Sequence, residues 1–526
     1  MAVAMLAAML AATWVAPVAV SGQRAQFAPH AMIASNSTPA SEAGVEILKR
    51  GGNAVDAAVA TGFALAVTLP EAGNLAGGGY MVVHMADGRS AAIDYRETAP
   101  RAATRTMYVD ASGKNTGESL VGYKAAGVPG SVAGLYEVQR RFGRLPFAQV
   151  VAPAIRLAEQ GFVVDSMTAR VIEKCAPLLS RFQSRDVFLR DGHAPAVGTK
   201  LMQPALAKTL RAIAAHGAEA FYHGAIAHAL AEDMHANGGI VTEEDLAAYK
   251  PAWKTPVVTK FHGYTLLGMP LSSSGGITMS RIFAALDTIP IAPLGSVAQV
   301  SALTNAMRDA FEYRNTKLGD TTAVASALRQ TREGNETTHY SVVDADGNAV
   351  STTTTINSLF GAGAYTGSVG VFWNNEMDDF AVQPGVPNQF GLVMGEQNSV
   401  APGRRPLSSM SPTIVLDSTG KLLLVVGSRG GPRIITSTTQ VILNVIDHHL
   451  TLADAMRAPR LHHQALPDTL LYEPQGVTSA VADSLKAKGI ATAETPSVGL
   501  VDAVLRVSGG YEGMDDPRRQ AAAVGY

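Results

Sequence analysis

Cysteine is nearly absent from this chain of 526 residues. Its single cysteine, Cys175, cannot form an intramolecular disulfide, and one thiolate cannot build a cysteine metal cluster. The residue lies in the apolar, helical-looking stretch 171–180, so we expect it to pack in the core and not to act as a nucleophile. The folded chain must therefore take its stability from its buried core.

An excess of charge of either sign is also missing. The 42 Lys and Arg residues nearly balance the 44 Asp and Glu residues, which leaves a net charge of -2. Nucleic-acid-binding proteins need a basic surface, so this composition argues against a nucleic-acid partner. The length exceeds the roughly 250 to 300 residues at which a single core usually stops growing, which allows either several domains or one large layered sandwich.

Long hydrophobic runs are missing too, except at the start of the chain. Residues 1–20 are almost wholly apolar, and the small residues Ser21 and Gly22 follow them. This pattern is typical of a secretory signal peptide over 1–22, although the usual basic residue before the apolar run is absent. A membrane anchor is the alternative, because about 20 apolar residues can span a bilayer. We favour the signal, and so expect a periplasmic or secreted protein with no membrane segment after signal removal.

Helix and strand signals alternate along the rest of the chain. Asn53 can cap a helix that runs to Val67, and the stretch 122–314 has a mostly helical pattern with one strand-like segment at 253–267. A long helix is predicted over 433–450. Turn signals between alternating segments predict three hairpins, formed by residues 80–84 with 90–95, 338–344 with 348–355, and 413–417 with 421–427. Strand runs flanked by long apolar helices favour a layered α/β sandwich.

Thr337, at the start of one predicted strand, is a candidate nucleophile. A threonine hydroxyl is weakly nucleophilic until a base takes its proton, and the residue's own freed α-amino group can be that base. This amine titrates at about 7.7 to 8.0 in model peptides, which suits a general base. The mechanism requires a cut between Glu336 and Thr337, made when the same hydroxyl attacks the Glu336 carbonyl. Taken alone, these residues are better explained as a plain strand start.

Several longer motifs resemble those of the γ-glutamyltranspeptidase family (γ-glutamyltransferase, glutathione hydrolase). The resemblance extends over nearly the whole chain after the predicted signal and follows the family's order. Its motifs are Gly51-Gly52-Asn53-Ala54-Val55-Asp56-Ala57-Ala58, Gly77-Gly78-Gly79, Asp94-Tyr95-Arg96-Glu97, Val128-Pro129-Gly130-Ser131, Thr337 to Asp344, Asn374 to Phe380, Pro406 to Met410 and Gly430-Gly431. The resemblance implies a four-layer αββα sandwich of the N-terminal-nucleophile hydrolase type. Residues 23–336 would be its large-subunit segment and 337–526 its small-subunit segment.

The resemblance also implies the catalytic residues. Thr337 would be the nucleophile and its freed amine the base, while Thr355 would hydrogen-bond near it and support its activation. Gly430 and Gly431 precede a predicted helix, where their backbone N–H groups would stabilise an oxyanion. On sequence alone, the glycine pair is as well explained by a turn that enters the helix.

A glutamyl substrate carries a carboxylate and an ammonium far from the scissile bond. By resemblance, the α-carboxylate would be held by Arg96, Ser408 and Ser409, and the α-ammonium by Asn357, Glu376 and Asp379. In isolation, Arg96 is better explained by a solvated ion pair with Glu97 or Asp94. Asp378 and Asp379 would fit a loop cap or a metal site. The threonine chemistry needs no metal and no cofactor.

Three features depart from the family's pattern. Only the sixteen residues Thr321 to Glu336 separate the Leu318-Gly319-Asp320 motif from Thr337, a shorter connection than is typical, and it adjoins the bond to be cut. Glu376 stands where bacterial members commonly have glutamine, which would make the ammonium pocket more negative. Phe390 replaces the tyrosine often found in the lid loop, and the lost hydroxyl would loosen that gate.

The sequence therefore predicts a self-processing γ-glutamyl hydrolase/transferase. Thr337 would attack the γ-glutamyl amide of glutathione or a related compound, form a γ-glutamyl ester, and pass the acyl group to water or to an amino acid or peptide acceptor. The alternative within the fold is a glutaryl acylase for β-lactam side chains. Arg96 and Asp379 favour glutamate, because a glutaryl group has no ammonium. The alternative from another class is an unprocessed, non-catalytic binding protein.

Overall fold

The computed structural model describes residues 24–318, 337–519 and 521–526. The predicted signal peptide, the short connection 321–336 and Glu336 lie outside the described residues. Within the described ranges, no helix combines the length and apolar character needed to cross a membrane.

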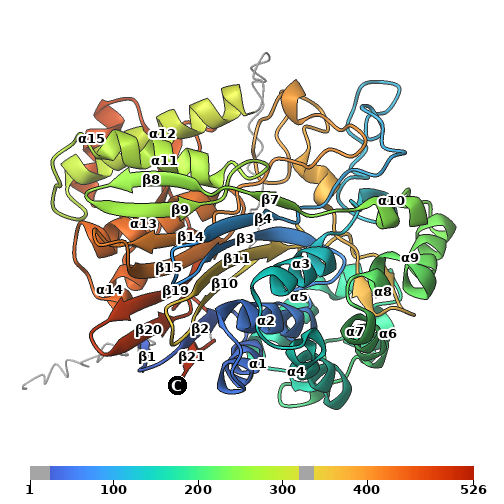
Figure 1. Ribbon diagram of the computed structural model, residues 1–526. Helices are drawn as coiled ribbons and strands as arrows, with labels where there is room; N and C mark the ends of the chain where they lie inside the picture. Colours follow the sequence, from blue (N-terminus) through green and yellow to red (C-terminus); the bar gives the residue numbers. More distant parts are fainter. Residues whose placement is uncertain (1–23, 319–336, 520) are drawn as a thin grey trace, which may run out of the picture.

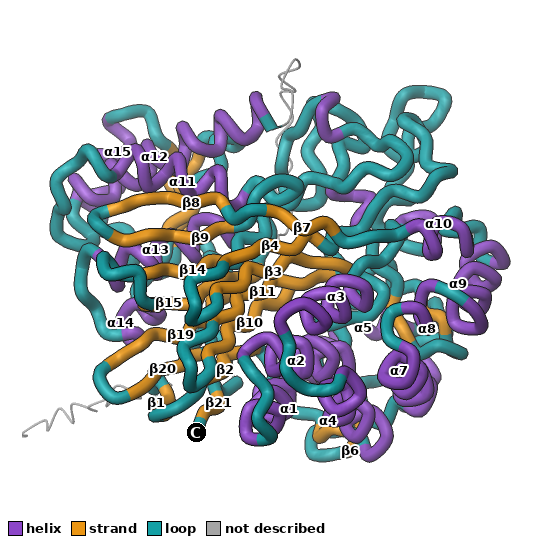
Figure 2. The backbone as a smooth tube through the Cα atoms, in the orientation of Figure 1, coloured by secondary structure: helices purple, strands orange, loops and turns teal. Residues whose placement is uncertain are grey.

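Two antiparallel sheets of seven strands each occupy the centre of the described structure (Figures 1 and 2). Strands β10 and β11 of one sheet contact β15 of the other, so the two sheets pack face to face. Sheet A contains, in spatial order, β1 (Gln26–Ala28), β20 (Gly510–Met514), β19 (Leu500–Val507), β15 (Leu422–Arg429), β14 (Thr413–Leu416), β9 (Tyr264–Gly268) and β8 (Val257–Phe261). Sheet B contains β21 (Val524–Gly525), β2 (Met32–Ser35), β10 (Thr337–Val343), β11 (Ala349–Thr355), β3 (Gly78–His84), β4 (Ser90–Asp94) and β7 (Ala252–Lys254).

Helices cover the outer face of each sheet, as Figure 1 shows. Sheet B is covered by α1 (Thr38–Lys49), α2 (Ala54–Thr68) and α3 (Ser131–Phe142), with α4 (Phe147–Gln160) packed against α1 and α2. Sheet A is covered by α11 (Gly275–Leu286), α13 (Arg433–Ile446) and α14 (Leu452–Arg457), with α12 (Val297–Lys317) packed against α11. The layers follow the order helix, sheet, sheet, helix, which is the predicted αββα sandwich.

Shorter elements connect and flank these layers. Cys175 is buried within α5 (Ser166–Leu179), in agreement with the expected packing role. The remaining helices are α5 (Ser166–Leu179), α6 (Arg185–Phe188), α7 (Pro204–His216), α8 (Glu219–Tyr222), α9 (Gly224–Ala236), α10 (Glu243–Ala248), α15 (Ser479–Ala487) and the 3-10 turns η1 (Tyr123–Ala125), η2 (Glu376–Asp379) and η3 (Glu396–Asn398). The remaining strands are β5 (Phe162–Val163), β6 (Lys200–Leu201), β12 (Tyr365–Thr366), β13 (Val371–Phe372), β16 (Leu461–His462), β17 (Thr469–Tyr472) and β18 (Ala491–Glu494).

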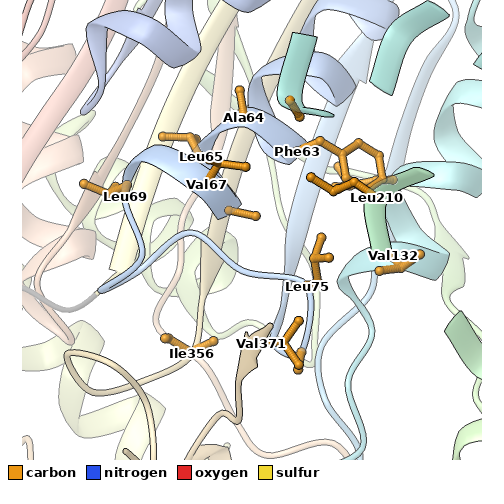
Figure 3. Packing of buried hydrophobic residues seen from close by; sticks show 14 of the residues in the cluster. Phe63, Ala64, Leu65, Val67, Leu69, Leu75, Val132, Leu210, Ile356 and Val371 are labelled. Carbon is orange, nitrogen blue, oxygen red and sulfur yellow. The ribbon is translucent and has the colours of Figure 1, made fainter. Parts of the chain in front are cut away.

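Helix α2 shows how the sequence determines a central element. The Asn53 side chain accepts hydrogen bonds from the first-turn amides, and the Asp56 carboxylate accepts one from the Asn53 amide, which completes a capping box. Every residue of α2 is buried, as its apolar composition on all sides predicts. Figure 3 shows Phe63, Leu65 and Val67 of this helix among other apolar side chains of the same cluster.

Strand β10 is an interior strand of sheet B, paired with β2 on one side and β11 on the other. Its side chains alternate between the two faces of the sheet. Tyr340 points toward α2, where its hydroxyl would lie 2.8 Å from a Cβ placed on Gly62. His339 points toward sheet A, where a Cβ on Gly427 would meet its ring at 2.3 Å. By this alternation, the side chain of Thr337 faces the space between the sheets.

Two predicted elements differ from those observed. The strand-like segment 253–267 is divided among three strands in two sheets, since Pro256 has no N–H for a ladder and the chain turns at His262-Gly263. The helix predicted over 433–450 ends at Ile446. His449 has a φ of +50°, and the Leu450 N–H donates back to the Asn444 carbonyl at 3.0 Å, an arrangement that terminates a helix.

Candidate active site

One pocket between the sheets brings the predicted site residues together. Of those that the structure describes, only Gly430 is not in its lining, and Gly430 adjoins a lining residue. The apolar residues Phe390, Leu392, Leu407, Met410, Pro432 and Ile434 complete the wall. The polar and glycine lining consists of Arg96, Thr337, Thr355, Asn357, Glu376, Asp379, Ser408, Ser409 and Gly431.

Thr337 and Thr355 are opposite each other in the β10–β11 register. Their hydroxyl oxygens lie 3.3 Å apart, and the Thr355 oxygen also accepts the Asn357 amide at 2.8 Å. Because Thr355 already accepts this bond, its own hydroxyl hydrogen is available to the Thr337 oxygen. Asn357 has a φ of +71°, a conformation that asparagine tolerates better than most residues, and its side-chain NH2 donates to the Asn375 carbonyl at 2.9 Å.

The glycine pair lies in the turn between β15 and α13. Gly430 and Gly431 have φ values of +123° and +55°, a region that favours glycine. A Cβ on Gly431 would lie 2.9 Å from the Phe390 ring, so the turn also permits a close approach by the segment that carries Phe390. Helix α13 begins at Arg433, and Gly431, Pro432 and Ile434 line the pocket, so the N-terminus of this helix, with its partial positive charge, lies at the pocket wall. The two explanations of the glycine pair, a turn that enters the helix and a site that binds an oxyanion, are therefore compatible.

Arg96 is the centre of a buried ion cluster and not a solvated ion pair. Its side chain is 1% exposed, and its Nη1 lies 2.8 Å from a Glu376 oxygen and 3.9 Å from a Glu97 oxygen. Its Nη2 donates to Asp379. Burial raises the carboxyl pKa of Glu376 and of Asp379, and the Arg96 charge opposes this rise. The guanidinium thus contacts Glu376 and Asp379 closely and lies near the carboxyl group of Glu97.

The backbone around Arg96 is held by another buried carboxylate, that of Asp94. The Arg96 amide donates to Asp94 at 3.0 Å, and the other Asp94 oxygen accepts the Ser272 hydroxyl at 2.9 Å. Lys254 and Arg405 balance the charge of Asp94, at 2.9 and 3.2 Å. These contacts fix the direction in which the Arg96 side chain enters the pocket.

Ser408 and Ser409 are held by the loop that leads into α11. The Ser274 amide and hydroxyl both donate to the Ser408 carbonyl, at 2.8 and 2.6 Å, and the Ser408 amide donates to the Ser272 carbonyl at 3.0 Å. The main chain of the serine pair is therefore fixed, and both side chains line the pocket.

Comparison with known proteins identifies the family. The family model described as gamma-glutamyltranspeptidase matches residues 40–331 and 324–526. The chain belongs to this family. A glutathione hydrolase proenzyme of Escherichia coli (strain K12) is 42% identical, covering 93% of this chain and 91% of that protein. A glutathione hydrolase proenzyme of Pseudomonas sp. (strain A14) is 40% identical, covering 95% of each chain.

A solved structure supports the same architecture. The cephalosporin acylase from Bacillus halodurans superposes with a TM-score of 0.83 at 25% identity and covers 99% of each chain. The fold is thus the N-terminal-nucleophile hydrolase sandwich predicted from the sequence. As a γ-glutamyltranspeptidase-family protein, the chain is an enzyme.

Asn374 is a structural residue of the site for which we predicted no role. The side-chain oxygen of Asn374 accepts hydrogen bonds from the backbone amides of Gly127 and Glu376, at 2.9 and 3.0 Å. Its NH2 group donates to the carbonyls of Ala76 and Gly127, at 3.0 and 2.9 Å. Asn374 therefore connects three loops, one of which presents Glu376. The only signal in the sequence was its position within a family motif.

Replacing Glu97 with glutamine is expected to change how stability depends on pH. Burial raises the pKa of Glu97 from 4.5 to about 8. Between these values the folded chain keeps a proton that the unfolded chain releases, so this stabilisation is complete below pH about 4.5 and is lost as the pH rises through about 8. A neutral glutamine avoids that loss. From pH 5 to 8, the unfolding free energy of Glu97→Gln should rise by roughly 3 kcal/mol relative to the wild type. Urea unfolding followed by circular dichroism measures the difference, and a constant offset between the two proteins would contradict it.

Proposed function

We propose that this protein is a self-processing γ-glutamyl hydrolase/transferase that acts on glutathione and other γ-glutamyl amides. The observation that carries the proposal is a single pocket that combines the Thr337 hydroxyl with a buried cluster of opposite charges around Arg96. The names of the two relatives that are about 40% identical support glutathione as a substrate. No cofactor or metal takes part in the proposed reaction.

In the proposed maturation, the Thr337 hydroxyl of the precursor attacks the Glu336 carbonyl. The peptide C–N bond breaks as the acyl group moves to the hydroxyl oxygen, and water then cleaves the resulting ester. The products are a large subunit from 23–336, after removal of a signal peptide over 1–22, and a small subunit from 337–526. The small subunit begins with a free amine on Thr337. The signal would deliver the protein to the periplasm or the medium.

In the proposed catalytic cycle, the Thr337 amine accepts the hydroxyl proton while the oxygen attacks the γ-carbonyl carbon. The oxyanion that forms is stabilised by the amides of Gly430 and Gly431. The amide C–N bond then breaks, and the leaving amine takes the proton from the Thr337 ammonium. The γ-glutamyl ester on Thr337 is attacked by water or by the amine of an amino acid or peptide, which restores the free hydroxyl. Thr355 donates to the Thr337 oxygen and keeps it oriented.

The other end of the substrate would be recognised by its two charges. Glu376, Asp379 and the carbonyl oxygen of the Asn357 side chain would accept the α-ammonium. Arg96, Ser408 and Ser409 would bind the α-carboxylate. On binding, the substrate ammonium would lie next to Glu376 and Asp379, and the substrate carboxylate would lie next to Arg96, so that positive and negative groups alternate.

A glutaryl acylase is less well supported. A glutaryl group would leave Glu376 and Asp379 without the added positive charge, and a site built around such polar groups discriminates strongly against a ligand that does not pair them. An acylase, the Acylase ACY 1 proenzyme of Pseudomonas sp. (strain V22), is 36% identical to this chain, which is less than the 42% identity of the Escherichia coli glutathione hydrolase proenzyme. An unprocessed binding protein would lack a free amine on Thr337.

The test uses the purified protein with two matched substrates, L-γ-glutamyl-p-nitroanilide and glutaryl-p-nitroanilide, which differ in the α-amino group. We expect two chains after purification, a new N-terminus at Thr337, and a kcat/KM at least about 10³-fold higher for the glutamyl substrate. Equal or better turnover of the glutaryl substrate would favour the acylase. An intact chain without turnover of either substrate would leave the binding protein as the correct description.

A further inference from the structure

Arg314 is a second buried arginine next to the predicted site, and none of the roles above involves it. It belongs to the last turn of α12 and is 1% exposed. A buried guanidinium is costly unless its donors and its charge are both satisfied. Its surroundings therefore indicate what it stabilises.

The donors of Arg314 hold the serine pair of the pocket in two ways. Its Nη2 donates to the Ser409 hydroxyl at 3.3 Å, and its Nε donates to the Ser274 hydroxyl at 3.0 Å. Ser274 in turn holds the Ser408 carbonyl through its amide and hydroxyl. The guanidinium therefore fixes Ser409 directly and Ser408 through one intermediate residue.

The charge of Arg314 has no ion-pair partner within 4.0 Å in the part of the chain that the structure describes. Its Nη1 donates to the neutral amide oxygen of Asn315 at 3.1 Å. Burial lowers the pKa of Arg314 to about 10, and the negative charge of Asp379 opposes this effect, so the group stays positive at neutral pH. Arg96, by contrast, is already paired with Glu376 and Asp379. Arg96 therefore has close carboxyl groups as partners, whereas Arg314 has none among the described residues.

We propose that Arg314 is a positioning and specificity residue for the substrate α-carboxylate, acting through Ser409. This inference rests on the proposed γ-glutamyl activity. The Ser409 oxygen accepts the Arg314 N–H, which leaves the serine hydrogen free to point into the pocket toward a carboxylate. The fixed positive charge behind that hydroxyl favours an anion at the same position. A substrate without the α-carboxylate gains nothing from either effect.

The test compares wild type, Arg314→Gln and Arg314→Lys on two anilides that differ in the α-carboxylate, L-γ-glutamyl-p-nitroanilide and 4-aminobutyryl-p-nitroanilide. We expect Arg314→Gln to raise KM for the glutamyl substrate about tenfold or more with kcat changed less than about threefold. Its kcat/KM for the aminobutyryl substrate should match the wild type. Arg314→Lys, which keeps the charge, should recover part of the lost affinity. Arg308→Gln, on the same helix with a side chain 35% exposed, is the matched control and should leave both substrates unaffected.

Equal losses on both substrates would overturn the proposal, because they would show that Arg314 only supports the fold of the pocket. Unchanged kinetics in Arg314→Gln would overturn it as well. If Arg314→Gln does not fold, Arg314→Lys provides the test. The measured quantity is then the ratio of kcat/KM for the glutamyl substrate to kcat/KM for the aminobutyryl substrate. If both values fall equally, so that this ratio equals that of the wild type, the proposal is contradicted. A wild type that cleaves neither anilide would refute the proposed function itself, an outcome separate from any difference between variants.

Discussion

Replacing Thr337 with alanine is expected to give a single uncut chain that releases no p-nitroaniline from L-γ-glutamyl-p-nitroanilide. The alanine has no hydroxyl to attack the Glu336 carbonyl, so neither the chain break nor the free amine can form. Loss of a catalytic nucleophile lowers kcat by several orders of magnitude, and here we expect at least about 10³-fold. Denaturing gel electrophoresis, N-terminal sequencing and the anilide assay measure the two effects.

Thr337→Ser is the matched control for that variant. Serine keeps the hydroxyl and, after cleavage, the amine, but it loses the methyl group that limits the rotamers of threonine. It should still be processed and retain measurable hydrolysis. Processing of Thr337→Ala at the wild-type position would contradict the assignment of Thr337 as nucleophile, because another group would then have to cut the bond.

Replacing Arg96 with glutamine is expected to have the second largest effect, on both stability and activity. The substitution leaves Glu376 and Asp379 in a buried site without the guanidinium that now contacts both. Removing one partner of a buried ion cluster typically costs about 3 to 5 kcal/mol, and part of this cost should appear as protonation of the two acids. The same change removes the predicted carboxylate partner, so kcat/KM should fall by about 10³-fold or more. Urea unfolding and the anilide assay measure these losses.

Arg96→Lys and the double variant Arg96→Gln/Glu376→Gln separate the two contributions. Lysine keeps a positive charge but cannot contact two carboxylates with one planar group, so it should recover stability more than activity. The double variant removes one uncompensated acid and should be more stable than Arg96→Gln alone. If Arg96→Gln has the same urea midpoint of unfolding as the wild type and keeps its activity, the buried ion cluster contributes to neither stability nor activity as predicted here.

The local elements of the fold were largely predictable from the sequence. The capping box at Asn53, the turn at Asp87-Gly88 and the β10–β11 hairpin follow from side chains within a few residues of one another. The division of 253–267 between two sheets was not predictable in the same way. It depends on which distant strands offer a free edge, and a strand pattern carries no information about its partner.

The site divides along the same lines. The resemblance supplied the polar and glycine residues that line the pocket, but not the ion pairs that Arg96 forms with Glu376 and Asp379, far from it in the sequence. Arg314 lay beyond sequence reasoning altogether, because its significance comes from the burial of α12 and from the position of Ser409. A single arginine on a helix is usually a solvated surface residue.

A cut before Thr337 would divide the chain but not the sheets. β10 and β11 lie between β2 and β3 in sheet B, and β20, β19, β15 and β14 lie between β1 and β9 in sheet A, so in each sheet strands from after the cut are flanked on both sides by strands from before it. Neither fragment would contain all strands of a sheet. If one fragment dissociated, strands of the other would lose their hydrogen-bonding partners. The two subunits would therefore be a single cooperative unit with two covalent pieces. Their separation would amount to global unfolding, and dilution alone should not dissociate them.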